Sequence, residues 1–161
     1  MNLTDKVVVI TGAARGLGAA LARGVVAHGG KVLLSDIDGT DLADLGKELG
    51  MPTLHCNVTD RDEVEALGRA AIEKFGALDV WINNAGIWMP YVPAENIDFG
   101  RAHLLMEVNY FGLAYGMLEA VKHMRERDAG MIVNILSVRS LKGKALGAAY
   151  SASKFAAEGF T

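Results

Sequence analysis

A tyrosine and a lysine stand four residues apart near the carboxyl end of the chain, in the stretch YSASK. Tyr150 and Lys154 share one face of a helix at this spacing, and an ammonium beside a phenol favours the phenolate form. Such a phenol can act as a general acid or base near neutral pH. Of the four tyrosines only Tyr150 has a lysine four residues later, although a chance pair on an exposed helix is a competing explanation.

A glycine-rich stretch near the amino end, TGAARGLG over residues 11–18, suggests a site for a phosphate group. It follows an apolar run and opens a stretch with helical spacing. Gly12, Gly16 and Gly18 leave room for a pyrophosphate to approach the amides of a helix N-terminus. For the glycines alone, a plain strand-to-helix turn is an equally good interpretation.

Asp36 ends the next apolar run, 18 residues after Gly18, and makes the nucleotide interpretation more specific. A carboxylate at this point accepts hydrogen bonds from a ribose and repels a 2′-phosphate, which favours NAD over NADP. Asp38 is a nearby competitor for the same role. Arg15 in the glycine loop could partly accommodate a phosphate, so NADP stays open as the less favoured cofactor.

Further polar residues follow two later apolar runs. The motif NNAG brings Asn83, Asn84 and Gly86 to the end of the fourth run, where a structural role in tying segments together is expected for Asn83. Ser137 follows the fifth run, at a position where a serine commonly caps a turn. The four histidines show no ligand spacing, and no metal site is expected.

These residues need a scaffold, and the apolar pattern predicts an α/β fold with a doubly wound parallel sheet of Rossmann type. Helical spacing alternates with short apolar runs, which implies a strand order of 3-2-1-4-5. All the candidate residues then lie at or just after the carboxyl ends of strands, where open sheets bind ligands. The expected strands are residues 6–10, 31–36, 52–58, 78–83 and 131–136.

The longest expected helix covers residues 101–127. Its stripe of Leu104, Val108, Phe111, Tyr115 and Leu118 is expected to face the sheet. Other apolar residues on this helix suggest a second contact, for which another subunit is a candidate. Before it, Asp60 and Glu63 have the spacing of a capping box at the start of an earlier helix.

Composition limits the classes of function. A chain of 161 residues with 51% hydrophobic residues forms one domain with its own core. The net charge of −3 gives no basic surface for nucleic acid or an anionic membrane, so a small molecule or another protein is the expected partner. Cys56 is the only cysteine and no apolar run approaches the ~18 residues of a membrane span, so a cytoplasmic protein is expected.

Taken together and in this order, TGAARGLG, NNAG, a serine 13 residues before a tyrosine, and YSASK resemble the common, shorter branch of the short-chain dehydrogenase/reductase family. The resemblance implies an NAD(P)-dependent oxidoreductase that interconverts a secondary alcohol and a ketone. In that family the residues matching Tyr150 and Ser137 contact the substrate oxygen, and Tyr150 would exchange a proton with it. Lys154 would hold the nicotinamide ribose, and the backbone of Asn109 would help a water join a proton relay.

The resemblance also extends the expected cofactor site. Asn57 stands where the family often has an aspartate against the adenine, a contact that an amide can still make, and Val58 lies beside it. The implied cofactor-binding residues are Gly12, Arg15, Gly16, Leu17, Gly18, Asp36, Asn57, Val58, Asn84, Ala85, Gly86, Tyr150 and Lys154.

Family members are usually longer, so the resemblance implies that this domain is truncated at its carboxyl end and that later strands and a substrate-covering loop are absent from the chain. The fifth strand is then expected to be a sheet edge that can pair with another chain, and a homodimer or homotetramer is expected. Two alternatives remain, a dinucleotide-binding module without turnover and an interaction protein that uses the sheet edge.

The expected substrate is an apolar or cyclic alcohol or ketone. This expectation rests on Ile87, Trp88, Met89, Tyr91 and Leu141, which could line a pocket or simply pack their loops.

Overall fold

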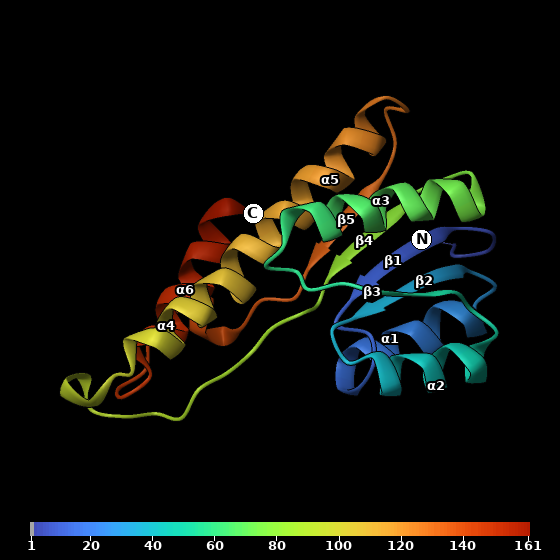
Figure 1. Ribbon diagram of the computed structural model, residues 1–161. Coiled ribbons are helices and arrows are strands. Elements are labelled where there is room, and N and C mark those ends of the chain that lie inside the picture. Colours follow the sequence, from blue (N-terminus) through green and yellow to red (C-terminus); the bar gives the residue numbers. More distant parts are fainter. Residues whose placement is uncertain (1) are drawn as a thin grey trace.

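The computed structural model describes residues 2–161, which form a five-stranded parallel sheet with helices on both faces (Figure 1). The strand order is β3-β2-β1-β4-β5, which confirms the predicted doubly wound topology. The strands are β1 (Val7–Thr11), β2 (Lys31–Asp36), β3 (Thr53–His55), β4 (Val80–Asn83) and β5 (Met131–Asn134).

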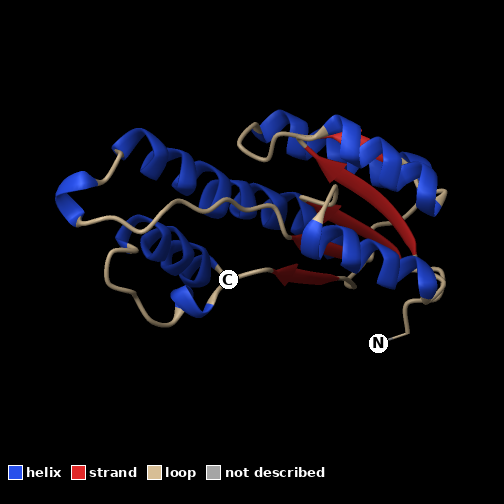
Figure 2. Ribbon diagram, turned by 90° about the horizontal axis from the view of Figure 1, so that it is seen from below, coloured by secondary structure: helices blue, strands red, loops and turns tan. Residues whose placement is uncertain are grey.

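Six α-helices connect or follow the strands in the described part of the chain. Helices α1 and α2 cover one face of the sheet and α3 and α5 cover the other, while α4 and α6 extend past the carboxyl ends of the strands (Figures 1 and 2). Their bounds are α1 (Gly16–Ala27), α2 (Gly39–Leu49), α3 (Arg61–Phe75), α4 (Phe99–Met106), α5 (Leu113–Arg125) and α6 (Ala148–Phe160). Within residues 2–161 no helix is long and apolar enough to cross a membrane.

The central residues of β1, β2 and β4 are apolar because both faces of these strands are covered, and polar residues stand at the carboxyl ends of the strands. In β1, Val8 and Ile10 point into the core with α1 and α2, whereas Val9 points into the core with α3 and α5. Trp81 of β4 is fully buried in the second core. The sheet thus lies between two separate cores, and this packing fixes the positions of the carboxyl ends of its strands.

The predicted stripe is only partly correct, because Val108 and Tyr115 pack against the core beneath α3 and α5 while its other three members do not. Leu104, Phe111 and Leu118 are 51%, 37% and 54% exposed and face away from the sheet. Gly116 faces it instead, so close that an added methyl group would overlap the side-chain oxygen of Asn83. Because no side chain fits at Gly116, the helix is turned so that Leu118 and Val121 point outward, while Ala120 and Met124 enter the core.

Asn83 has the structural role that its position suggested. Its side-chain oxygen accepts a hydrogen bond from the indole nitrogen of Trp81 at 2.7 Å, and its amide donates to Asn134 Oδ1 of the neighbouring strand at 2.8 Å. A buried asparagine with both ends paired joins β4 to β5 and orients the core tryptophan.

The helix predicted over residues 101–127 is not a regular α-helix. A π-helical segment, Glu107–Gly112, joins α4 to α5. Such segments insert extra backbone into the helix and are frequent at functional sites. Here the segment contains Asn109, whose side chain is buried.

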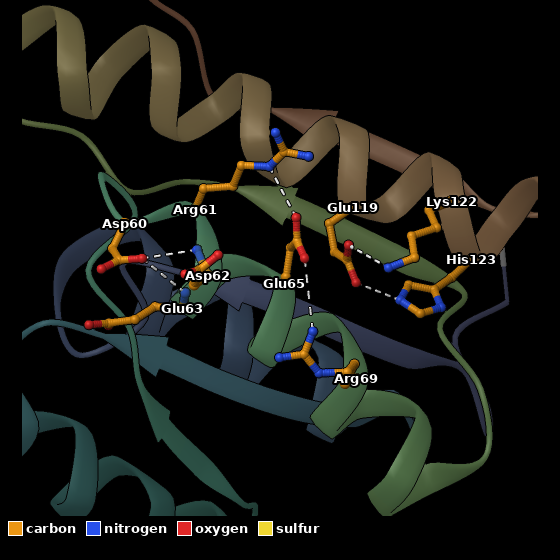
Figure 3. A network of polar contacts seen from close by, with 9 residues as sticks. All are labelled: Asp60, Arg61, Asp62, Glu63, Glu65, Arg69, Glu119, Lys122 and His123. Carbon is orange, nitrogen blue, oxygen red and sulfur yellow. Dashed lines mark hydrogen bonds and ion pairs between the residues drawn. The ribbon is translucent and has the colours of Figure 1, made fainter.

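The interface between α3 and α5 carries two sets of ion pairs, each confined to one helix (Figure 3). Glu65 pairs with Arg61 and Arg69 on α3, and the buried Glu119 pairs with Lys122 and His123 on α5. Asp60 caps α3 by accepting from the amides of Asp62 and Glu63. The side chain of Glu63 accepts from the amide of Asn57 instead of completing the expected capping box.

Changing Gly116 to alanine should destabilise the fold by about 1–3 kcal/mol, because the added methyl group overpacks the contact with Asn83. Gly24→Ala in α1 is the matched control, since nothing lies within 4 Å of the position its added methyl group would take and the position is helical. That change should stabilise the protein by about 0.5–1 kcal/mol. Urea unfolding of both variants checks the pair, and equal effects at the two positions would contradict the close packing of α5.

Candidate active site

A cleft of about 430 Å³ opens at the carboxyl ends of the strands. The residues of the predicted cofactor site that line it are Gly12, Arg15, Leu17, Gly18, Asp36, Asn57, Val58, Asn84, Ala85 and Gly86. It also takes in Ile37, Cys56, Thr59, Ile87, Leu104 and Val108, which the sequence did not single out for a cofactor. Residues from five separate stretches of the chain therefore share one cleft. Its volume lies in the range of small-molecule sites.

The loop after β1 and the loop after β4 are joined by hydrogen bonds. Thr11 Oγ1 accepts from the amides of Asn84 and Ala85 at 3.1 and 3.2 Å, and Asn84 Nδ2 donates to the carbonyls of Thr11 and Gly12. A methyl group on Gly12 would lie 2.7 Å from the Cα of Ala85. The glycine here is needed because two backbones meet without room for a side chain.

The N-terminus of α1 faces the cleft with its amides available. The helix has no side-chain cap and no acidic residue in its first turn. Gly16 adopts a positive φ of 57°, and nothing lies within 4 Å of the space that a side chain would occupy. An uncapped helix N-terminus bordered by open space is suited to an anion such as a pyrophosphate.

Asp36 belongs to the cleft, whereas its competitor Asp38 does not line it. The Asp36 carboxylate accepts from the amide of Ala14 at 2.9 Å and from the amide of Asp38 at 3.0 Å. Asp38 instead caps α2 and pairs with Arg15 at 3.3 Å, and Asp41 lies 3.9 Å from the same guanidinium. The charge of Arg15 is therefore shared with two carboxylates.

Asn57 and Cys56 form the cleft wall beyond β3. Asn57 Oδ1 accepts from the amide and the hydroxyl of Thr59, so this side chain also shapes its own loop. Burial raises the pKa of the Cys56 thiol to about 11. The thiol therefore stays protonated and acts as an apolar wall.

Asn109 ties the loop after β4 to the carboxyl-terminal helix. Its side chain accepts from the amide of Ile87 at 2.8 Å and donates to the Ile87 carbonyl at 2.9 Å. It also donates to Ser153 Oγ of α6 at 3.1 Å. The π-helical segment brings this side chain to the loop, so the side chain positions other groups in addition to any role of its backbone.

Lys154 is a buried cation at the end of the cleft. Its ammonium donates to the carbonyl of Ile135 at 3.1 Å, and the side chain is only 6% exposed. The desolvation that comes with burial lowers the pKa of Lys154. A methyl group on Gly86, which lines the cleft, would lie 3.7 Å from the ammonium nitrogen. Gly86 thus brings the lining of the cleft next to Lys154, whereas Gly16, Tyr150 and Lys154 themselves do not line it.

Ser137 and Tyr150 lie on neighbouring elements beyond β5. Ser137 caps the short turn Val138–Ser140, and its hydroxyl accepts from the amide of Arg139 at 3.1 Å. The turn packs against α6, which carries Tyr150. Tyr150 borders a narrow crevice together with Met89, Pro90, Tyr91, Val92, Ile97, Leu146, Gly147 and Ala149. Of the residues expected to line a substrate pocket, Met89 and Tyr91 reach this crevice, while Leu141 is 76% exposed and does not.

The match with known proteins covers almost the entire chain. The sequence profile described as "short chain dehydrogenase" matches residues 6–161, so the chain belongs to the short-chain dehydrogenase family. It is 34% identical over 165 residues to 3beta-hydroxysteroid dehydrogenase 2 of Eggerthella lenta and 36% identical over 172 residues to trans-4-hydroxycyclohexanecarboxylate dehydrogenase of Sinomonas cyclohexanicum. These matches cover 99% of this chain but only 64% and 65% of the two relatives.

Solved structures agree with this assignment. A short-chain dehydrogenase/reductase of Burkholderia phymatum in complex with NAD superposes with a TM-score of 0.94 at 30% identity, over 99% of this chain and 58% of that one. A short-chain dehydrogenase of Mycobacterium smegmatis gives a TM-score of 0.94 at 28% identity, over 99% and 70% of the two chains. The predicted family and fold are therefore confirmed.

The buried charge of Lys154 should make stability depend on pH. Because its pKa is lowered in the folded state, the folded protein holds this proton less tightly than the unfolded chain. The free-energy cost of burying this charge is fully present below the pKa that Lys154 has in the folded protein. It disappears as pH rises to the ordinary lysine pKa of 10.5. Wild type should therefore gain free energy of unfolding relative to Lys154→Met between neutral pH and about pH 10.

Urea unfolding at several pH values measures this difference. The exposed lysine of α3 provides the control, and Lys74→Met should show no such trend. If the free energy of unfolding of wild type stayed constant or fell relative to that of Lys154→Met as pH rises, a charged, desolvated Lys154 would be contradicted.

Proposed function

We propose that this protein is an NAD-dependent oxidoreductase that interconverts a secondary alcohol and a ketone. The observation that carries the proposal is the position of Gly86, which lines the cleft and lies against the ammonium of Lys154. A dinucleotide with its adenosine at Asp36 and its pyrophosphate at the α1 N-terminus would thereby reach the helix of Tyr150. The non-catalytic module and the sheet-edge interaction protein have no comparable observation in their favour.

The residues around the cleft fit NAD better than NADP. Asp36 presents a carboxylate that is held in place by the amide of Ala14, where it can accept from ribose hydroxyls. A 2′-phosphate at this point would meet the charge of Asp36. Arg15 offers little compensation, since Asp38 and Asp41 already share its charge.

In this proposal the bound nicotinamide supplies the acceptor or donor of hydride. Tyr150 as phenolate takes the hydroxyl proton of the alcohol, and in the reverse direction the phenol returns it to the ketone oxygen. Ser137 donates its hydroxyl hydrogen to the same oxygen while its lone pair accepts from Arg139 N. Lys154, fixed by the Ile135 carbonyl, holds the ribose and places positive charge near the phenolate.

The proposed substrate is an apolar, ring-shaped alcohol or ketone. Met89, Tyr91 and Leu146 supply apolar surface next to Tyr150. The names of the two relatives describe a hydroxysteroid and a hydroxycyclohexanecarboxylate as substrates, which are secondary alcohols on saturated rings.

We also propose that the protein forms a homodimer or homotetramer in the cytoplasm. The outward apolar stripe on α4 and α5, with Phe111 and Leu118, is the surface that favours association. Sedimentation equilibrium of the wild type would contradict the proposed association if the protein stayed monomeric.

The proposed cytoplasmic location rests on the single cysteine, which is buried and unpaired.

Asp36→Asn should reduce the preference for NADH over NADPH at least about tenfold, because the repulsion of a 2′-phosphate is removed while the side chain can still accept from Ala14. Fluorescence titration with both nucleotides measures the preference. Asp44→Asn on the exposed surface of α2 is the control, since Asp44 pairs with Lys47 and neither residue lines the cleft. An equal effect of the two substitutions on this nucleotide preference would contradict binding of the adenosine ribose at Asp36.

Tyr150→Phe should lower turnover of cyclic ketones by NADH at least about 100-fold, because the proton donor is lost. The affinity for NADH should change less than about threefold, since a lost neutral contact at one end of the cofactor is a small part of its binding. Tyr115→Phe on α5, remote from the crevice, should leave both quantities unchanged. Activity that survives Tyr150→Phe would mean that another group is the acid.

A further inference from the structure

The loop between Ser137 and Tyr150 is basic in an acidic protein. The chain has a net charge of −3, yet it contains no Asp or Glu between Asp128 and Glu158. Arg139, Lys142 and Lys144 all lie in that interval. Positive charge is therefore concentrated in the segment that connects the two proposed catalytic residues.

These three cations have no carboxylate partners. All the ion pairs of Lys and Arg in the described residues involve other side chains, namely Lys6, Arg15, Arg23, Lys47, Arg61, Arg69, Lys122 and Arg127. The facing loop, residues 87–98, carries Glu95 and Asp98. The Asp98 carboxylate caps α4 by accepting from the amides of Gly100 and Arg101, and neither acid lies within ion-pair distance of the basic loop. Unpaired cations beside a site attract anions and raise their local concentration.

Lys144 lies beside Tyr91, which lines the crevice that Tyr150 borders. Its ammonium lies over the ring of Tyr91, 5.0 Å from the ring centroid. The edge of that ring lies against Gly147, where an added methyl group would be 2.8 Å away. The amide of Val92 donates to the Leu146 carbonyl at 2.9 Å, so the two loops lie side by side (Figure 1). Tyr91, Gly147 and Leu146 all line the crevice with Tyr150.

The N-terminus of α6 adds to the positive electrostatic potential near the crevice. Gly147 precedes the helix without a side-chain cap, and no acid lies in the first turn. Ala149 and Tyr150 of this turn border the crevice. The positive end of the helix dipole therefore acts on the same space as Lys144.

We infer that the substrate carries a carboxylate, and that Lys144 is the residue that anchors it while Tyr150 acts on its hydroxyl or ketone group. This inference rests on the proposed oxidoreductase function and names its substrate class. The crevice lining is otherwise apolar, with Met89, Val92, Ile97 and Leu146. The crevice itself holds only about 10 Å³, so the apolar body of a singly charged acid would lie across its rim while the one charge stays at the exposed ammonium.

The test compares acids with their neutral esters in the full-length protein with NAD. A hydroxycyclohexanecarboxylate and mandelate are paired with their methyl esters, and kcat/KM is measured for each. Wild type should prefer the acid about tenfold or more, in line with electrostatic steering at a cationic site. Lys144→Met should remove this preference, mainly through KM, and Lys144→Arg should retain it. Lys74→Met removes the same charge from the exposed surface of α3 and should change nothing.

A preference for the esters, or an equal loss for acid and ester in Lys144→Met, overturns the inference and leaves the oxidoreductase proposal intact. If the wild type turns over neither the acids nor the esters, the result counts against the proposed function. A binding measurement then tests whether the site prefers a carboxylate. Ligand-observed NMR in the presence of NADH compares cyclohexanecarboxylate with cyclohexylmethanol. Tighter binding of the carboxylate that is lost in Lys144→Met supports the inference, and binding no tighter than that of the alcohol overturns it.

Discussion

The hydrogen bonds between the loop after β1 and the loop after β4 are the constraint on which the rest of the site depends. Thr11 and Asn84 hold the two loops together, and Gly12 lets their backbones meet. This contact places the N-terminus of α1 opposite Gly86 across one cleft. A side chain at Gly12 would push Ala85 away and separate the two halves of the site.

A second set of contacts joins the loops at the carboxyl ends of β4 and β5 to α6. Asn109 holds Ile87 and Ser153, and Lys154 holds the carbonyl of Ile135 after β5. Each of these polar side chains is buried and paired, as buried polar groups must be. The helix that carries Tyr150 is therefore held from two sides, by the loop after β4 and by the end of β5.

Strand order, the bounds of β2 and the gathering of the glycine loop with Asp36 could be predicted from the sequence, because they follow from periodicity and from the position of strand ends. The orientation of α5 could not. Helical spacing marks two apolar faces, and only the close approach of Gly116 to Asn83 decides which one meets the sheet. The π-helical segment at Asn109 likewise depends on contacts between distant residues, which no local pattern records.

The most direct test of this account is an amide chemical-shift titration of the isotopically labelled full-length protein with NAD. The account predicts shifts in four groups that are distant in sequence and share the cleft, namely residues 12–18, Asp36 with Ile37, residues 56–59 and residues 84–87. It also predicts shifts at Tyr150 and Lys154, where the far end of the dinucleotide should arrive. Shifts confined to other parts of the sheet, or none at saturating NAD, would contradict the assignment of this cleft as the cofactor site.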